Sequence, residues 1–352
     1  MKAARWYNAK DIRVEEIPEP KVENGQVKIK VAYAGICGSD LHEYLVGPIF
    51  IPVNELHPIS KDKAPVVMGH EYAGEVVEVG EGVTSVKVGD RVCVEPIYRC
   101  GECASCKKGH YNVCEKLGFI GLSGGYGGFA EYSVVPLNMV HKIPDQMSWE
   151  QAALVEPAAV AVHAVRQSGL RIGDTAAVFG TGPIGLLTIQ AARAAGASQI
   201  IAVEVSPERQ EFARKVGADI VINPLETDVV TEIQSHTGGS GVDVSFEVAG
   251  IEATINAAIQ ATKLEGNIVN ISIWEKPASI PLNSLVLTEK QMTSIIAYRN
   301  IFPQVIQLIA NDQIKALDLV TKYIGLDEIV PEGFEALTKN KSQIKILVNP
   351  SK

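Results

Sequence analysis

The sequence lacks any run of 18 or more apolar residues, the length at which a segment is read as a membrane-spanning helix. Its first residues also lack the apolar core of a secretory signal peptide. Basic residues are few, since 32 Lys and Arg face 41 Asp and Glu, and the net charge of −9 repels nucleic acids and anionic membranes because no basic cluster offsets it. We therefore expect a cytoplasmic protein that binds neither nucleic acid nor membrane.

Internal repeats and low-complexity segments are absent as well, so the composition gives no sign of disorder. Apolar residues make up 46% of the chain and charged residues 21%, which is typical of a folded globular protein. Because 352 residues exceed what one hydrophobic core usually organises, we expect two domains.

The pattern of apolar residues changes along the chain. Up to about Asp145 it consists of short β-rich runs of period two, such as residues 26–32 and 73–79. After about Ile295 it is mixed, with a helical pattern at 302–309 and a β-like run at 344–348. This last segment is compatible with a return of the chain to the first domain.

Between these regions, from about Ala158, apolar strands alternate with alanine-rich helical patterns. This alternation predicts a parallel sheet with helices on both faces. The expected strands are 176–179, 199–203, 220–222, 242–247 and 267–271.

Cysteine is also scarce, and in a reducing cytosol the six cysteines favour metal ligation or redox chemistry over disulfides. Four thiolates can close a tetrahedral shell around Zn²⁺ without an open position, as in structural zinc sites. An iron–sulfur cluster is the alternative occupant, disfavoured by the long final gap and by the lack of a proline after the last cysteine. Cys93 alternates within a β-like run and is expected in the core. The four candidate ligands lie within fifteen residues: Cys100, Cys103, Cys106 and Cys114.

A glycine-rich loop follows the first apolar strand of the second region and precedes a helical pattern. Gly180 permits the tight turn, Gly182 lets a pyrophosphate approach the backbone, and Gly185 lets the helix pack on the strand. Pro183 and Ile184 complete the loop at the helix N-terminus, whose amides and positive dipole end favour phosphates. The segment therefore predicts a dinucleotide-binding site.

Glu204 stands nineteen residues after Gly185, at the end of the second apolar strand. Its carboxylate can accept hydrogen bonds from the adenosine ribose and would repel a 2′-phosphate, so we predict NAD rather than NADP as the cofactor. Arg209 is a candidate contact to the ribose or the adenine edge. The alternative is a glycine-rich turn in a non-binding α/β protein, with Glu204 a solvated surface residue.

Two short motifs complete the pattern, Cys37-Gly-Ser-Asp-Leu-His42 and Gly69-His70-Glu71. In this order, with the cysteine cluster and the glycine loop, they resemble the medium-chain zinc-dependent alcohol dehydrogenases along nearly the whole chain. The resemblance implies an α/β protein with a Rossmann doubly wound parallel sheet and a β-rich GroES-like catalytic domain that carries a structural zinc lobe. We place the GroES-like domain at 1–157 and 296–352, the lobe at 95–116 and the Rossmann domain at 158–295.

The same resemblance implies two zinc ions per chain and NAD. Cys37, His70 and Glu156 correspond to the ligands of a catalytic zinc; glutamate at the third position departs from the familiar members, which carry cysteine there, and matches the polyol branch. Glu71 corresponds to a residue beside the metal, and whether it or water completes the metal's shell is left open.

The resemblance also implies the proton path. Ser39 corresponds to the hydroxyl that takes the proton of the alcohol, and His42 to the imidazole that passes it through the cofactor ribose to solvent. A turn-forming serine and a surface histidine are the alternatives.

The substrate is suggested by further segments that resemble the 2,3-butanediol branch of the family. An apolar, proline-stiffened stretch suits the methyl groups of a four-carbon diol better than the hydroxyls of a hexitol. We therefore expect interconversion of a vicinal diol and its hydroxyketone, with (R,R)-2,3-butanediol and acetoin or diacetyl as leading compounds. The segments are 43–52, 54–58, 246–250, 272–276 and 298–303.

Other functions stay open at this point. Oxidation of sorbitol, another polyol or threonine could use the same scaffold. A zinc-containing nucleotide-binding or structural protein without activity is the non-enzymatic alternative, disfavoured by the joint presence of the ligand and proton-transfer residues. The family also leads us to expect a homodimer or homotetramer, with an extended strand of the nucleotide domain as the contact.

Overall fold

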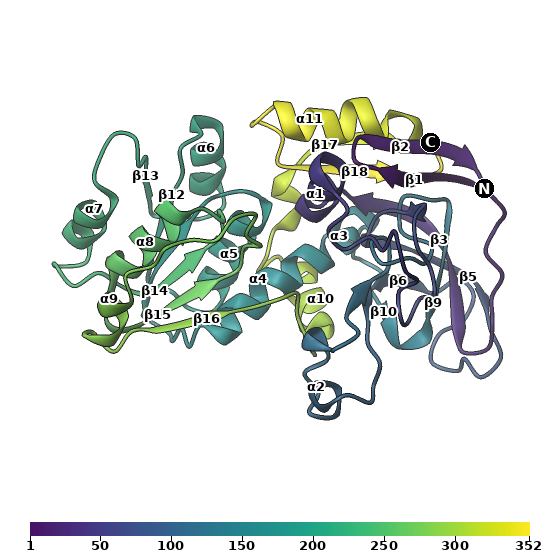
Figure 1. The fold of residues 1–352 in the computed structure, drawn as a ribbon, viewed down its shortest axis with the longest axis horizontal. Helices are drawn as coiled ribbons and strands as arrows, with labels where there is room; N and C mark the ends of the chain where they lie inside the picture. Colours follow the sequence, from purple (N-terminus) through teal and green to yellow (C-terminus); the bar gives the residue numbers. More distant parts are fainter. The chain divides into compact units, whose positions relative to one another are not determined.

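The computed structural model describes residues 1–352 and divides into two compact units (Figure 1). The β-rich unit comprises Met1–Glu156, Phe302–Ala310 and Val320–Lys352, and the parallel-sheet unit comprises Pro157–Ile301 and Asn311–Leu319. No helix combines the length and the apolar character that a bilayer crossing requires.

The β-rich unit is built from a three-stranded sheet, a seven-stranded sheet and a two-stranded ribbon. Their orders are β2-β1-β4, β10-β6-β5-β3-β18-β17 with β9 also paired to β3, and β7-β8. The strands are β1 (Lys2–Asn8), β2 (Asp11–Glu16), β3 (Gln26–Gly35), β4 (Val66–Val67), β5 (Glu71–Val79), β6 (Arg91–Val94), β7 (Ile97–Tyr98), β8 (Gly118–Phe119), β9 (Tyr132–Pro136), β10 (Val140–Lys142), β17 (Val320–Gly325) and β18 (Lys345–Asn349). The helices are α1 (Gly38–Val46), α2 (Ala104–Lys107), α3 (Trp149–Ala153), α10 (Phe302–Ala310) and α11 (Glu335–Lys339), and α4 (Val155–Gln167) begins here and continues into the other unit.

The two period-two runs form the central pair of the large sheet. Residues 26–32 and 73–79 lie in β3 and β5, which are antiparallel and slightly longer than expected. The C-terminal run at 344–348 corresponds to β18, which pairs with β3 through Leu347 opposite Gly35. The end of the chain thus joins the sheet beside the end of β3, from which α1 follows.

The parallel-sheet unit contains six strands in the order β13-β12-β11-β14-β15-β16, all parallel. This is the order of doubly wound dinucleotide-binding folds, as the fold prediction required. The strands are β11 (Thr175–Phe179), β12 (Gln199–Val203), β13 (Ile220–Ile222), β14 (Val242–Glu247), β15 (Thr262–Asn270) and β16 (Gln291–Ser294). The helices are α5 (Pro183–Ala194), α6 (Pro207–Lys215), α7 (Val229–His236), α8 (Glu252–Ala261) and α9 (Leu282–Val286).

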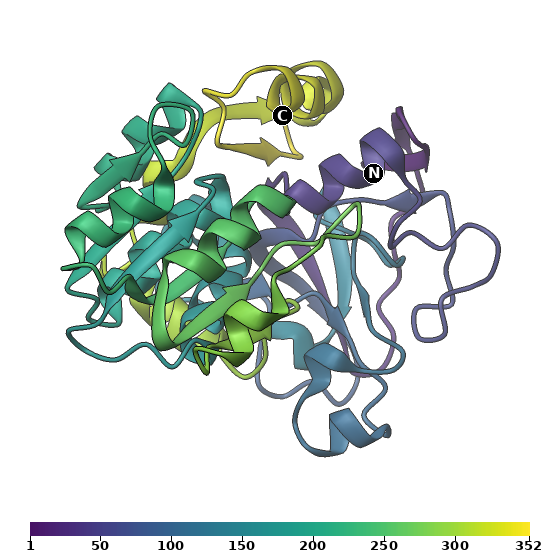
Figure 2. The same cartoon turned by 60° about the vertical axis from the view of Figure 1, so that its left-hand side comes forward.

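Alternate residues of the inner strands pack on opposite faces of the sheet. Phe179 and Ile201 belong to the apolar cluster that includes Ile233 of α7 and Ile259 of α8. Helices α5 and α6 pack on β11, β12 and β13 (Figure 2). The sheet is thereby covered by helices, and the carboxyl ends of β11 and β12 lead into the glycine loop and to Glu204.

Two strand features differ from the expectation. Strand β15 begins at Thr262 rather than at residue 267, and it was predicted too short because the charged residues Lys263 and Glu265 and the glycine at 266 break the apolar pattern. Strand β16 was not predicted, because all four of its residues are exposed and three of them are polar.

The division into units also differs from the expected bounds. Residues 296–301 and 311–319 belong to the parallel-sheet unit, although the sequence had assigned 296–352 to the other domain. The backbone of Lys315 donates a 2.6 Å hydrogen bond to Oε1 of Gln190 in α5, and Tyr298 and Ile301 are buried. The apolar pattern alone did not reveal which core these segments join.

Candidate functional site

The four predicted lobe cysteines converge on one point. Their Sγ atoms all lie within 4.8 Å of one another, with 3.5 Å between Cys114 and Cys100 and 4.0 Å between Cys100 and Cys106. Tetrahedral zinc with Zn–S bonds of about 2.3 Å requires S–S separations of roughly 3.8 Å. The sulfurs, carried on the projecting segment around α2 (Figures 1 and 2), therefore fit a closed zinc site.

Backbone amides point at these sulfurs. Cys103 donates from its N–H to Sγ of Cys100 over 3.3 Å, and Cys106 donates to Sγ of Cys103 over 3.5 Å. Hydrogen bonds from the amides of Cys106 and Glu115 lower the pKa of Cys103 to about 6. Burial and the neighbouring thiols raise the pKa of Cys106 to about 12, so a cation is needed to bring this thiol to the thiolate form near neutral pH.

A second cluster of metal-ligating side chains lies in the same unit. Ligand atoms of Cys37, His70 and Glu71 lie within 4.8 Å of one another. Cys37 immediately precedes α1, and His70 and Glu71 lie at the start of β5. The N-terminal end of α1 and the first residues of β5 therefore bring the three side chains together. A thiolate, an imidazole and a carboxylate are the donor types that Zn²⁺ prefers.

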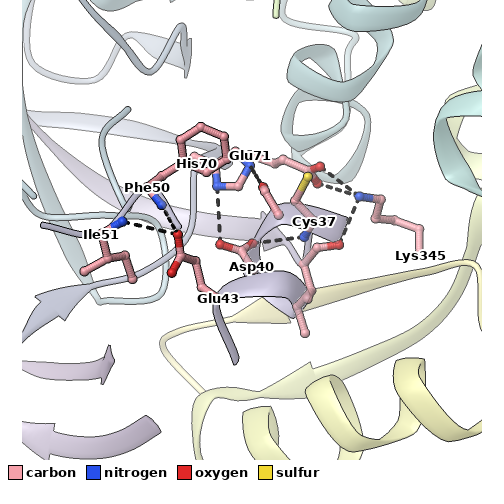
Figure 3. A network of polar contacts seen from close by, with 10 residues as sticks. Cys37, Asp40, Glu43, Phe50, Ile51, His70, Glu71 and Lys345 are labelled. Atoms are coloured by element: carbon pink, nitrogen blue, oxygen red, sulfur yellow. Dashed lines mark hydrogen bonds and ion pairs between the residues drawn. The ribbon is translucent and has the colours of Figure 1, made fainter. Parts of the chain in front are cut away.

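His70 is held between two residues of α1 (Figure 3). Its Nε2 lies 3.1 Å from Oγ of Ser39, and its Nδ1 lies 3.3 Å from Oδ1 of Asp40. Nδ1 and Oδ1 have no other hydrogen-bond partner, and Oδ2 of Asp40 accepts the N–H of Cys37 over 3.0 Å. Asp40 therefore directs Nδ1 to itself and leaves Nε2 facing the cluster.

The charges around His70 favour a positive ion in this place. Burial would lower the pKa of His70, but Asp40 and Cys37 raise it well above its ordinary value. A metal ion at Nε2 would satisfy the same negative charges in place of the proton.

Glu71 is paired with a lysine from the other end of the chain. Nζ of Lys345 in β18 lies 2.9 and 2.7 Å from the two carboxylate oxygens and donates to the carbonyl of Ile36 over 3.0 Å. Both side chains are buried. Burial opposes the charge of Lys345, yet Glu71 and Cys37 raise its pKa, so the pair carries no net charge.

The remaining predicted residues lie as follows. Ser39 and His42 are three positions apart on α1 and so share one helix face. Glu156, in the first turn of α4, is 6% exposed and lies outside the cluster of Cys37, His70 and Glu71; its charge also raises the pKa of Lys345.

Sequence reasoning missed Asp40 and Lys345. Asp40 stood within the motif that carried the family resemblance, and its place three residues after Cys37 was the signal that could have revealed it. Lys345 gave no such signal, because 274 residues separate it from Glu71.

The glycine loop has the geometry that its motif predicts. Gly180 has a φ of +97°, which favours glycine, and a Cβ at Gly185 would lie 2.0 Å from the carbonyl oxygen of Gly180. Gly182 is the N-cap of α5, and Pro183 occupies the first turn ahead of Ile184. The helix N-terminus thus faces the turn with its amides free of side-chain caps.

Glu204 contacts this loop directly. Its Oε2 accepts from the N–H and Oγ1 of Thr181 over 2.8 and 3.0 Å, and its Oε1 accepts from the N–H groups of Val205 and Ser206, each over 3.0 Å. These four bonds use the acceptor positions of an ionised carboxylate. A ribose hydroxyl that bound here would share or replace one of them.

Arg209 lies near the same turn. A Cβ at Gly182 would lie 4.0 Å from its Nη1, and its buried Nε has no hydrogen-bond partner. A buried donor without a partner is costly, so an acceptor on a ligand would satisfy it.

The chain belongs to the zinc-binding, medium-chain alcohol dehydrogenases. Residues 23–145 match the model of the alcohol dehydrogenase GroES-like domain, and residues 183–311 match that of the zinc-binding dehydrogenase family. The chain is 57% identical to (R,R)-butanediol dehydrogenase of Bacillus subtilis (strain 168) and 45% identical to (R,R)-butanediol dehydrogenase of Neisseria gonorrhoeae (strain ATCC 700825 / FA 1090), in both cases over 100% of each chain. It is also similar to the crystal structure of 2R,3R-butanediol dehydrogenase from Bacillus subtilis, with a TM-score of 0.94, 57% identity and 99% of each chain covered.

The four-cysteine cluster can be tested by Cys103→Ser. We expect loss of one zinc ion per chain and a lower midpoint of thermal unfolding, because the lobe loses the ion that closes it. Metal analysis and thermal unfolding measure both effects. Cys93→Ala, at a buried cysteine outside the lobe, should leave the zinc count unchanged. Retention of two zinc ions in Cys103→Ser would contradict the four-thiolate site.

Asp40 can be tested by Asp40→Asn. Loss of the charge that orients His70 should weaken zinc binding at the Cys37–His70 cluster by about 10- to 100-fold, leaving the lobe zinc in place. Chelator competition followed by metal analysis measures the difference. The exposed Asp145 offers the same change as a control, Asp145→Asn, and equal affinities in the two variants would show that Asp40 does not support the metal.

Proposed function

We propose that this protein is a zinc-dependent, NAD-linked oxidoreductase that interconverts (R,R)-2,3-butanediol and acetoin. The observation that carries the proposal is the convergence of Cys37, His70 and Ser39, with Asp40 behind the imidazole, in a chain 57% identical to a butanediol dehydrogenase along its whole length. The family membership supports hydride transfer, and the relatives' names support the diol.

Cys37, His70 and Glu156 would hold the catalytic zinc, and the four lobe cysteines a second, structural ion. When bound, zinc lowers the pKa of an alcohol and NAD accepts the hydride from its carbon. Glu71 would lie beside the metal, and its pairing with Lys345 keeps the buried carboxylate neutralised. This pairing favours water or substrate, rather than Glu71, as the fourth ligand.

The chain's own residues would move the proton. If Nε2 of His70 held the zinc, Oγ of Ser39 would lose its 3.1 Å contact with that nitrogen and could accept the proton of the substrate hydroxyl while its own hydroxyl proton passes to the cofactor ribose. His42, one helical turn further along α1, would pass the proton to solvent by way of the cofactor ribose. Asp40 fixes the imidazole throughout.

The cofactor would lie on the loop from Gly180 to Gly185, with its pyrophosphate at the N-terminus of α5. Glu204 places a buried negative charge at the end of β12, where a 2′-phosphate would meet it, and this favours NAD over NADP. The unpaired Nε of Arg209 would donate to the ribose or the adenine edge.

Strand β16 would form the contact between subunits of a homodimer or of a larger homo-oligomer. It is the edge of the parallel sheet, and its four residues are exposed. An unprotected edge strand is a template for pairing with a second strand. Leucine and valine side chains nearby are also exposed, as expected of a surface that a partner covers: Leu282, Val286 and Leu287.

The substrate can be tested by initial rates of NADH formation with the stereoisomers of 2,3-butanediol, sorbitol and threonine. We expect the highest kcat/KM with (R,R)-2,3-butanediol and the reverse reaction with acetoin. Cys37→Ser should abolish both, because it removes a zinc ligand and leaves the fold intact. A higher kcat/KM with sorbitol or threonine, or full activity of Cys37→Ser, would reject the assignment.

The cofactor preference can be tested by Glu204→Gln. Removal of the charge should raise the ratio of NADP to NAD usage on the order of tenfold, since each 1.4 kcal/mol changes an affinity by that factor. The ratio of the two kcat/KM values measures it. The exposed Glu211 in α6 provides a matched control, Glu211→Gln, whose ratio should equal that of the unaltered protein. An unchanged ratio in Glu204→Gln would speak against a role of Glu204 at the ribose.

A further inference from the structure

Glu43 follows Asp40 by three positions on α1, so the two carboxylates project one above the other from the same helix face. Asp40 contacts Cys37 and His70, whereas Glu43 contacts the chain that follows the helix (Figure 3). Its carboxylate is 0% exposed and lies 3.0 Å from the N–H of Ile49 and 3.2 Å from that of Ile51. The N–H between them, that of Phe50, donates to the same carboxylate.

The backbone amides of these three residues are the donors that stabilise the buried carboxylate of Glu43. Glu43 forms no ion pair with Lys, Arg or His, so the cost of burying its carboxylate is offset by the three consecutive N–H donors. A backbone segment that offers three amides to one group can take only a narrow range of positions. Residues 49–51 are therefore fixed relative to α1, which begins directly after the candidate zinc ligand Cys37.

The segment held in this way is apolar on its outer side. The side chains of Ile49 and Val53 are 47% and 37% exposed, whereas Ile51 is buried. The inner side is anchored, since the carbonyl of Phe50 accepts from Oγ of Ser123 over 3.4 Å and the Phe50 ring lies 6.1 Å from that of Phe119. The loop is thus held on one side through Phe50, and the apolar side chains of Ile49 and Val53 are exposed on the other side.

We propose that Glu43 is a positioning residue that sets substrate specificity: it fixes this apolar segment relative to α1, and the segment forms a wall of the substrate site beside Cys37 and His70. The inference rests on the proposed diol dehydrogenase function. A wall of isoleucine and valine accepts the terminal methyl groups of 2,3-butanediol, whereas the hydroxyls of a hexitol would lose their hydrogen bonds against it. Because the wall contacts the parts of the substrate that do not react, its displacement changes binding more than the chemical step.

The test is Glu43→Gln, which keeps the shape of the side chain but replaces one acceptor oxygen with an NH₂ group facing the loop amides. We expect KM for (R,R)-2,3-butanediol to rise on the order of tenfold with kcat within about twofold, and the preference for butanediol over sorbitol in kcat/KM to fall by a similar factor. The zinc content should stay unchanged. Amide hydrogen exchange of a peptide spanning 47–53 should become faster, while that of the lobe 95–116 does not.

Glu55→Gln is the matched control. Glu55 is an exposed glutamate in the same stretch of chain, and its substitution should leave KM, kcat, the substrate preference, the zinc content and the amide exchange unchanged. If Glu43→Gln does not fold, Glu43→Asp can be used instead. It keeps the charge but shortens the side chain and so moves the carboxylate away from the loop amides. We then expect smaller changes in KM, substrate preference and amide exchange. An unaltered KM and sorbitol preference, or a loss of zinc together with kcat, would overturn the proposal. Failure of the unaltered protein to oxidise butanediol would instead reject the proposed function, and exchange at 47–53 would still report whether Glu43 holds the loop.

Discussion

The double contact of the Asp40 carboxylate is the interaction on which the candidate site depends. One oxygen accepts the N–H of Cys37 and thereby ties the carboxylate to the residue at which α1 starts, and the other oxygen faces Nδ1 of His70. A carboxylate of the kind that caps helices therefore also orients His70, a candidate metal ligand at the start of a different element. Ser39, His42 and Glu43 lie on the same helix, so one local structure positions the candidate ligands, the residues of the proposed proton path and the loop that follows the helix.

Buried glutamates recur in this chain as organisers of loops. Glu43 accepts three consecutive amides, Glu204 accepts the amides of Thr181 and Ser206 among others, and Glu247 accepts those of Ala249 and Gly250. None of the three forms an ion pair, because backbone donors take the place of cations. Loops that bind ligands need unpaired backbone groups close to the ligand, and a carboxylate at the base of the loop satisfies those that point inward. In contrast, the buried carboxylate of Glu71 is neutralised by a cation, the ammonium group of Lys345.

The sequence predicted those parts of the fold that have local signals. Strands 199–203, 220–222 and 242–247 were predicted with the bounds that the structure has, because the first two are mainly apolar runs and the third alternates apolar with polar residues. Strand β16 was missed because exposed polar residues carry no such pattern, and residues 311–319 were assigned to the other domain because apolar periodicity does not tell which core a segment joins.

The same limit applies to the site. The four cysteines and the glycine loop could be recognised from spacing within a few residues, since the ligand geometry itself dictates that spacing. Asp40 and Glu43 belong to one short helix, but what they contact depends on tertiary structure. The sequence predicted Glu204 as an acceptor for the ribose, but it did not predict the bonds from three backbone N–H groups and the Thr181 hydroxyl, because these depend on how the turn at Thr181 folds back.

The pairing of Glu71 with Lys345 has a consequence for how the molecule is assembled. Glu71 lies at the start of β5, and Lys345, which pairs with it, lies at the start of β18. The carboxylate is therefore placed by the N-terminal part of the sequence and neutralised by the C-terminal part. During synthesis the chain that carries Cys37 and His70 must wait for residue 345 before this interior can close without an unbalanced charge. Neutralisation of Glu71 beside the candidate metal ligands and pairing of β18 with β3 in the large sheet are therefore one event in folding.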